Sequence, residues 1–338
     1  RGRKSTPLAG VPGVLDCTKE VESISVMATK KSKLEGIVSL AAEPTTFDVT
    51  AVQGARGRTA LTGHENGTIV CTALSGKAPF VKVDNAHTTA VTQVSYDGAS
   101  AGAFKSKSTF YSAAADGSVK IWTVSGKSPT CSQSFEYHSQ SVVYLQPHPV
   151  SQYLMSVSTD GTWAALDTSA GVIARQSSAG ESVTCGACHP DGLLIASATS
   201  SGVVNVWDMR ERAPNFTQLE GGNGLQRATG LSFSENGYHL GTGHASGVVA
   251  LWDLRKMKML KRHDGKSPVG GVAFDYSAQR LAGAYSGHVT VLPVKEWSEA
   301  VVTVQSNTES TKALVWNGAG EEQQLLMTDG LDLQVLSR

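Results

Sequence analysis

The sequence predicts an all-β protein, a seven-bladed β-propeller. A small polar residue followed by glycine and then by an alternating apolar segment occurs seven times along the 338 residues. The glycines lie roughly 40 to 50 residues apart, which is the repeat length of four-stranded propeller blades. They are Gly67, Gly117, Gly161, Gly202, Gly247, Gly287 and Gly330. Seven repeats therefore indicate seven blades.

Each repeat has the pattern of strands joined by tight turns. Asn, Asp or Ser before Gly suits a hairpin turn in which the glycine takes a positive φ. Residues 118–122, after one such turn, alternate between apolar and polar as a strand does. Small apolar residues precede the turn, as at 194–198, and would let neighbouring sheets pack closely. A further turn upstream, as at 189–192, indicates at least three strands in a blade.

The chain divides into a short leading segment and one propeller. Residues 1–20 start with a basic run and contain scattered Pro and Gly, which predicts a flexible linker remnant. Residues 21–338 are assigned to the propeller. Residues 22–28 alternate well and are expected to form the outer strand of the last blade. An N-terminal strand in that place would close the last blade and remove exposed sheet edges.

Composition argues against several classes of function. Lys plus Arg number 29 and Asp plus Glu number 29, so the formal net charge is zero and no overall field favours nucleic acid or anionic membranes. No apolar run approaches the roughly 18 residues that predict a membrane span. The cysteines are few and scattered, which is typical of reduced thiols inside a cell. They are Cys17, Cys71, Cys131, Cys185 and Cys188.

The repeats resemble those of WD-repeat proteins. Trp207-Asp208, Trp252-Asp253 and the block at 116–122 match the motif that ends such a repeat. In that family a His, a Ser, an Asp and the Trp form a buried hydrogen-bonded set within a blade. The resemblance implies a structural polar set in the second blade. Its members are His87, Ser112, Asp116 and Trp122.

Other blades depart from this pattern. The third blade has His138, Ser156 and Asp160, but Leu166 stands in the Trp position. The first, sixth and seventh blades carry non-aromatic residues there, namely Thr72, Leu292 and Val335. We expect these blades to be held more by packing than by polar networks.

A longer stretch resembles the propeller of one family of spliceosomal U-box ubiquitin ligases, pre-mRNA-processing factor nineteen. The segments that carry the resemblance are HPDGL at 189–193, WDMRER at 207–212, FSENGY at 233–238, WDLRK at 252–256 and KEW at 295–297. Their order and spacing are more specific than the WD dipeptide. The likeness is strong from about 185 to 261 and weak before 111, which indicates a divergent eukaryotic source.

The resemblance implies a docking role. Members of this family carry a U-box, which recruits the ubiquitin-charged conjugating enzyme, and a coiled coil that forms homotetramers. This sequence shows neither pattern, so we expect a monomeric fragment that is not itself an enzyme. The full-length protein is expected to be a nuclear splicing factor that binds NineTeen-complex proteins and ubiquitination substrates.

The resemblance also suggests where partners bind. In WD-repeat proteins the residues just before the innermost strand of each blade surround one mouth of the central channel. Alignment of the repeats places there Thr89, Gln140, Glu181, Gln226, Arg227, Lys266 and Glu309. Arg227 and Lys266, on adjacent blades, would offer donors to an acidic or carbonyl-rich peptide. The alternative is that all of these are solvated loop residues.

Two other classes of function stay open. One is a generic WD-repeat scaffold with no link to splicing or ubiquitin. The other is a haem or metal protein, because Cys185, Cys188 and His189 match the haem c attachment pattern. Residues three apart on a strand point to opposite faces, so the two thiols would not easily share a ligand. We therefore expect no metal and no cofactor.

No catalytic residues are assigned. His87, Ser112 and Asp116 have the residue types of a hydrolase triad, but their match to the WD-repeat polar set favours a structural role. A basic cluster has two explanations, a solvated outer strand that resists edge pairing or a contact with an acidic partner or an RNA backbone. Its members are Arg255, Lys256, Lys258, Lys261, Arg262 and Lys266.

Overall fold

The structure, a computed structural model, consists of seven β-sheets. It describes residues 35–41, 49–55, 59–73, 81–96, 108–125, 128–211, 216–219, 225–297, 302–305, 311–317, 324–329 and 332–337. All regular secondary structure within these ranges is β-strand, and each sheet has four antiparallel strands. This confirms the predicted all-β class and the number of blades.

Strands follow one another in sequence from the inner to the outer edge of a blade. The first blade comprises β2 (Val49–Ala55), β3 (Thr59–His64), β4 (Ile69–Ala73) and β5 (Val81–Val83). The second comprises β6 (Val91–Tyr96), β7 (Ser108–Ala114), β8 (Ser118–Ser125) and β9 (Ser128–Glu136). The third comprises β10 (Val142–Pro147), β11 (Tyr153–Ser158), β12 (Thr162–Asp167) and β13 (Val172–Ser178).

The next three blades repeat this order. The fourth comprises β14 (Val183–Cys188), β15 (Leu194–Thr199), β16 (Val204–Asp208) and β17 (Phe216–Gln218). The fifth comprises β18 (Ala228–Phe233), β19 (His239–His244), β20 (Val248–Asp253) and β21 (Lys258–Asp264). The sixth comprises β22 (Val269–Phe274), β23 (Arg280–Tyr285), β24 (His288–Pro293) and β25 (Val302–Gln305).

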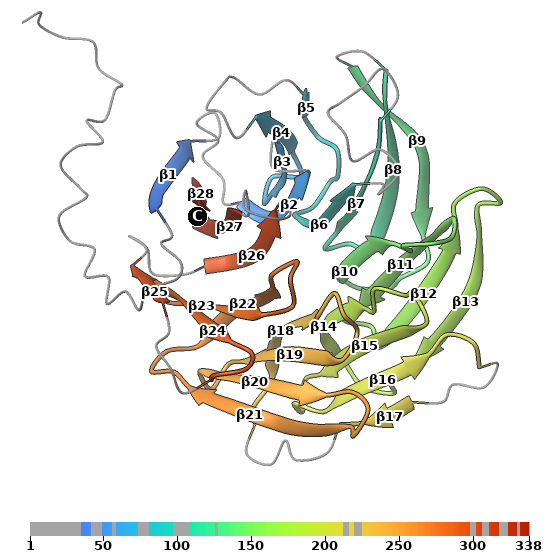
Figure 1. Cartoon of the computed structure of the whole chain (residues 1–338). Helices are drawn as coiled ribbons and strands as arrows, with labels where there is room; N and C mark the ends of the chain where they lie inside the picture. Colours follow the sequence, from blue (N-terminus) through green and yellow to red (C-terminus); the bar gives the residue numbers. More distant parts are fainter. Residues whose placement is uncertain are drawn as a thin grey trace, which may run out of the picture.

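The seventh blade combines strands from both ends of the described chain. Its strands β26 (Thr311–Asn317), β27 (Gln324–Asp329) and β28 (Asp332–Ser337) are completed by β1 (Glu35–Ala41), which pairs antiparallel with β28. Blue β1 beside red β28 is visible in Figure 1. An N-terminal strand therefore closes the last blade, as predicted. The segment at 22–28, expected to do so, lies outside the described residues.

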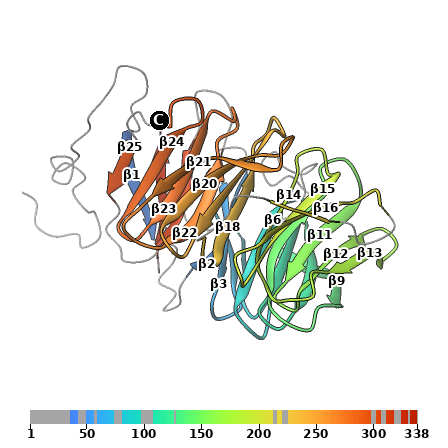
Figure 2. The same ribbon diagram turned by 90° about the horizontal axis from the view of Figure 1, so that it is seen from below.

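The blades are arranged around a common axis. Inner strands of neighbouring blades contact each other in the order β2, β6, β10, β14, β18, β22 and β26, and β26 in turn contacts β2. Figure 1 shows these strands gathered around the middle of the molecule, and Figure 2 shows the same sheets after a 90° turn. Because each inner strand leads outward through its own sheet, loops before the inner strands lie at one end of the axis and the turns after them at the other.

The repeated glycines meet two requirements of the fold. The six that the structure describes have φ values between 77° and 89°, as the hairpin turns demand. Five of them, all but Gly287, are also seen to pack under the loop that leads into the next blade. A Cβ on Gly161 would lie 2.7 Å from the carbonyl oxygen of Glu181, and one on Gly247 would lie 2.8 Å from that of Gly265. Any side chain there would push the loop away.

The core consists of apolar layers between neighbouring blades. Strand β20 shows how one strand serves two layers, because successive residues point to opposite faces. Ala250 and Trp252 pack toward the fourth blade, whereas Val249 and Leu251 pack toward the sixth. All six residues of β20 are buried. This arrangement explains why strands of the sequence carry apolar residues on both faces.

Candidate functional site

Three of the four predicted polar residues of the second blade are joined by hydrogen bonds. Ser112 Oγ accepts a bond from Trp122 Nε1 at 2.8 Å and bonds His87 Nε2 at 2.6 Å. His87 Nδ1 bonds Ser118 Oγ at 2.8 Å. The carboxylate of Asp116 accepts the backbone N–H of Ser118 at 2.9 Å and does not bond the imidazole. Asp116 therefore connects to the buried set only through Ser118, which the sequence pattern did not include.

The surroundings of this set favour a structural role over hydrolysis. Ser112 is fully buried and His87 is 2% exposed, so a substrate has no path to the hydroxyl. Burial, and the charge of Lys120, lower the pKa of His87 to about 4. The imidazole is therefore neutral near pH 7 and serves as a fixed hydrogen-bonding group.

The third blade has a polar network beside the packing that was expected to be its main support. Ser156 Oγ bonds His138 Nε2 at 2.8 Å and the hydroxyl of Tyr137 at 3.0 Å. His138 Nδ1 lies 3.4 Å from Asp160 Oδ2. Leu166 is buried among apolar side chains. Tyr137, one residue before the repeat histidine, thus takes the role that the indole N–H has in the second blade.

A second kind of polar pair occurs in the first and fifth blades. Trp252 Nε1 donates to Thr242 Oγ1 at 3.0 Å, and that oxygen bonds His244 Nε2 at 2.8 Å. In the first blade Thr62 Oγ1 bonds His64 Nε2 at 3.1 Å. The first blade therefore adds this polar pair to the packing that was expected to hold it. The signal in the sequence is the triplet Thr-Gly-His, which occurs at 62–64 and 242–244.

The remaining blades give less information about the Trp position. Leu292 of the sixth blade is fully buried in an apolar cluster. The side chains of Thr72 and Val335 lie outside the described set. Packing at this position is thus seen directly in the sixth blade.

The six predicted rim residues that the structure describes lie in the loops before inner strands, and the five that are exposed form the rim set. They are Gln140, Glu181, Gln226, Arg227 and Lys266. Gln140 accepts a hydrogen bond from Thr159 at 3.3 Å, and Glu181 accepts one from Ser201 at 3.1 Å.

The two cations of the rim differ from their neighbours. Within the part of the chain that the structure describes, the side chains of Arg227 and Lys266 have no hydrogen bond or ion pair. Thr89, also predicted here, instead accepts the backbone N–H of Asp116 at 3.2 Å. Glu309 lies outside the described residues. Arg227 and Lys266 thus keep their donors available to a partner.

At least half of the basic cluster is already engaged within the propeller. Lys261 donates to two backbone carbonyls of the sixth blade, each at 2.9 Å. Arg262 pairs with Asp264 at 2.7 Å, and Arg255 with Asp253 at 3.5 Å. These contacts favour the explanation that the cluster belongs to a solvated outer strand.

The two thiols of the haem-like motif face different apolar layers. Cys185 packs between the fourth and fifth blades, and Cys188 packs against the layer between the third and fourth. Burial raises the pKa of both thiols to about 12, so neither is a thiolate near neutral pH. Among the residues that the structure describes, no group of three or more His, Cys, Asp or Glu side chains could hold a metal ion. The geometry opposes a shared haem or metal ligand.

A cavity of about 510 Å³ follows the inner strands. Inner-strand residues of the second to seventh blades line it, and so do five residues of the turns after these strands, Pro149, His189, Pro190, Glu235 and Tyr276. None of the rim set belongs to this lining. The cavity therefore opens at the end of the axis opposite the predicted rim.

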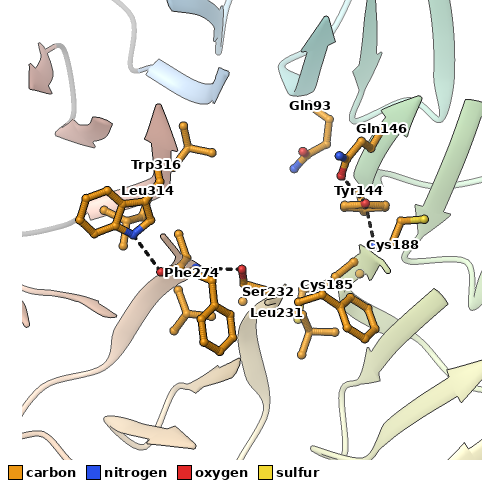
Figure 3. A pocket seen from close by; sticks show the side chains of 18 of the residues that line it. Gln93, Tyr144, Gln146, Cys185, Cys188, Leu231, Ser232, Phe274, Leu314 and Trp316 are labelled. Atoms are coloured by element: carbon orange, nitrogen blue, oxygen red, sulfur yellow. Dashed lines mark hydrogen bonds between the residues drawn. The ribbon is translucent and has the colours of Figure 1, made fainter. Parts of the chain in front are cut away.

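Hydrogen bonds between blades fix the wall of this cavity. Tyr144 accepts the backbone N–H of Cys188 at 2.7 Å and donates to Gln146 Oε1 at 2.6 Å (Figure 3). On the other side, Ser232 Oγ accepts the backbone N–H of Phe274 at 3.0 Å. Such contacts order the wall before any ligand binds.

Comparison with known proteins agrees with the fold. A family model described as "Nucleolar protein 10-like, N-terminal domain", a β-propeller, matches residues 144–328, more than half of the chain. A second, "WD domain, G-beta repeat", matches residues 78–123. The described part of the chain contains no helix able to cross a bilayer.

The similar curated proteins are pre-mRNA-processing factors by name. Pre-mRNA-processing factor 19 of Oryza sativa subsp. japonica is 30% identical over 287 residues, which is 83% of this chain and 50% of that protein. Pre-mRNA-processing factor 19 homolog 2 of Arabidopsis thaliana is 35% identical over 58% of this chain and 36% of its own length. The Homo sapiens protein is 32% identical over 57% of this chain and 38% of its own length. This chain thus spans at most about half the length of these relatives. The nucleolar protein 10-like model matches the larger part of the chain, and the relatives reported above are pre-mRNA-processing factor 19 proteins. The chain therefore belongs to the WD-repeat β-propeller family.

Proposed function

We propose that this propeller is the partner-docking domain of a nuclear pre-mRNA splicing factor. One observation carries the docking role: Arg227 and Lys266 are exposed before the inner strands of adjacent blades, with no partner among the described residues. The names of the relatives support the link to splicing. The docking site is the channel mouth at this end of the axis.

The rim set suits an acidic or carbonyl-rich peptide. A guanidinium offers five donors in a planar fork, and an ammonium offers three, so both cations can bind carboxylates or backbone carbonyls. Gln140 and Glu181 are held by hydroxyl groups of their own blades, which reduces the entropy lost when a peptide binds. The mixed charge of the rim would set the direction of the peptide.

For the whole protein, the proposal includes activities outside this chain. This chain resembles a family in which a U-box recruits the ubiquitin-charged conjugating enzyme and a coiled coil forms homotetramers. The partners would be NineTeen-complex proteins and ubiquitination substrates, and the compartment would be the nucleus. The propeller itself supplies recognition and no catalytic group.

The docking site can be tested by reversing its two cations. Arg227→Glu combined with Lys266→Glu should weaken capture of splicing proteins from nuclear extract at least about tenfold, or about 1.4 kcal/mol. Mass spectrometry would identify the captured proteins, and the melting temperature should stay near that of the unchanged propeller. The matched control is Arg255→Glu with Arg262→Glu on the outer surface. Loss of capture in the control alone would move the site to that surface.

A separate experiment tests whether this chain only docks partners and takes no part in ubiquitin transfer or tetramer formation. This chain alone, with activating enzyme, conjugating enzyme and ubiquitin, should form no ubiquitin chains above background. Light scattering should return the mass of one chain. Robust ubiquitin chains, or a tetramer, would show that this part of the protein does more than dock partners. Capture of no splicing protein would instead favour a generic WD-repeat scaffold.

A further inference from the structure

The end of the axis opposite the rim carries a row of exposed apolar side chains. They lie in the turns after the inner strands of four consecutive blades, and we call them the turn face. Its members are Val150, Leu193, Tyr238 and Tyr276, which are 81%, 38%, 51% and 59% exposed. The other exposed large hydrophobic residues of the described ranges lie on the outer strands β13 and β21. Clustered apolar exposure of this kind marks interaction sites on soluble proteins.

Neighbouring turns of this face are tied together. His148 Nε2 bonds the carbonyl oxygen of Gly192 in the next blade at 3.0 Å, and His189 Nε2 bonds that of Gly237 in the blade after it, also at 3.0 Å. The same contact thus recurs from the third blade to the fifth. The turns of the third to fifth blades therefore form a fixed platform, and a ligand would lose little entropy in ordering them.

The mouth of the cavity lies within this platform. The second residue of each turn lines the cavity, and these residues are Pro149, Pro190, Glu235 and Tyr276. Among the described residues that line it, Glu235 is the only Asp, Glu, Lys or Arg. Apolar side chains with one carboxylate thus surround the opening.

Glu235 lacks a counter-ion in the part of the chain that the structure describes. Within the described residues Glu235 has no hydrogen bond or ion pair, although its neighbours remove enough water to raise its pKa. The nearby Asp191, in contrast, lies 2.6 Å from His189 Nδ1. A cationic group of a ligand beside Glu235 would therefore be attracted by a carboxylate whose charge no described residue neutralises.

The two aromatic rings of the turn face also differ in whether a cation lies over them. The guanidinium of Arg255 lies 5.1 Å from the centre of the Tyr238 ring, a cation–π contact. Tyr276, on the next blade, has no such cation among the described residues. A ligand cation between Glu235 and Tyr276 would complete a similar contact.

Polar groups deeper in the cavity are also available. Gln146 accepts the Tyr144 hydroxyl through Oε1, so its amide N–H groups keep their donors for a ligand. Figure 3 shows Gln93 close to Gln146 on this side of the cavity. Amide donors here suit the carbonyl groups of an extended chain.

We propose that this mouth is a second docking site, for an extended protein segment in which an arginine or lysine is flanked by apolar residues. The cation lies between Glu235 and Tyr276, and the flanking side chains cover the rest of the turn face. Gln146 bonds the backbone of the segment. The site goes beyond the rim docking proposed above, and its success or failure does not depend on Arg227 or Lys266.

The probe is a phage-displayed library of random peptides, selected on the intact propeller. Enriched sequences should carry an Arg or Lys beside Leu, Ile, Val, Phe or Pro. A labelled synthetic copy of one such peptide is then titrated by fluorescence polarisation. Glu235→Lys should weaken its binding about tenfold or more, and Tyr276→Ala about fivefold or more, whereas Tyr276→Phe should stay within about twofold.

The matched control is Glu136→Lys, an exposed carboxylate at the end of β9. It should leave peptide binding within about twofold, because charge far from the mouth is screened. Thermal melts of every variant establish that the propeller stays folded. Selection of acidic peptides, selection of none, or unchanged binding by Glu235→Lys would each overturn the proposal. Loss of peptide binding in the rim variant alone would overturn it as well.

Discussion

Ser112→Ala gives a direct test of the polar set in the second blade. Ser112 is fully buried, and its hydroxyl bonds both Trp122 Nε1 and His87 Nε2. Removing it leaves two buried polar groups without this partner. Each such group costs about 1–3 kcal/mol, so we expect a loss of about 3 kcal/mol in the free energy of unfolding.

Denaturant titration followed by far-ultraviolet circular dichroism measures this loss. The matched control is Ser134→Ala, an exposed serine on strand β9, which should change stability by less than about 0.5 kcal/mol. A double-mutant cycle isolates the indole bond. In a Trp122→Phe background, which lacks the N–H, Ser112→Ala should cost about 1 kcal/mol less.

Two results would refute this reasoning. One is a loss from Ser112→Ala no larger than that from Ser134→Ala. The other is an equal loss with and without the indole at position 122. Either result would mean that packing, rather than the hydroxyl, holds this blade together.

Three other perturbations have defined outcomes. Trp122→Ala should cost about 3–5 kcal/mol and Leu166→Ala about 2–4 kcal/mol in denaturant melts, and the reverse order would contradict the placing of these residues. Gly247→Ala, with φ at 87°, should cost about 2 kcal/mol or more, whereas Gly271→Ala, whose Cβ would meet nothing closer than 3.7 Å, should cost under about 1 kcal/mol. Because the pKa of His87 falls from 6.5 to about 4 on folding, the unfolded chain takes up the proton first. Stability should therefore drop as pH falls through that window, by up to about 1.4 kcal/mol per pH unit, and His87→Asn should flatten the profile.

Local requirements explain why the blades could be predicted. The turn glycine must adopt a positive φ. Because it has no Cβ, the loop that leads into the next blade can also pack against it. Both requirements repeat in each blade, so glycine occurs at the same place in each repeat. The outer strand of the last blade is different. Its partner β28 lies almost a whole chain length away from β1, so alternation alone cannot choose between residues 22–28 and 35–41.

The polar sets were predictable only where the spacing follows one register. Ser112 lies opposite Lys120 in the β7–β8 pair, and Trp122, two residues on, is on the same face. Tyr137 reaches the equivalent position of the third blade from a loop, which spacing along the strand does not reveal. The turn face combines single residues from four sheets, so no local motif announces it.

The pairing of β1 with β28 has a consequence for synthesis in the cell. Ile37 faces Leu336, so this sheet joins residues from the two ends of the propeller. The first six blades can form in order as they leave the ribosome, but the last sheet must wait until β28 has been synthesised. Through that interval β1 remains an unpaired edge that could recruit strands from another chain. The rate of the final joining step, rather than the stability of any single blade, then governs how much newly made protein escapes aggregation.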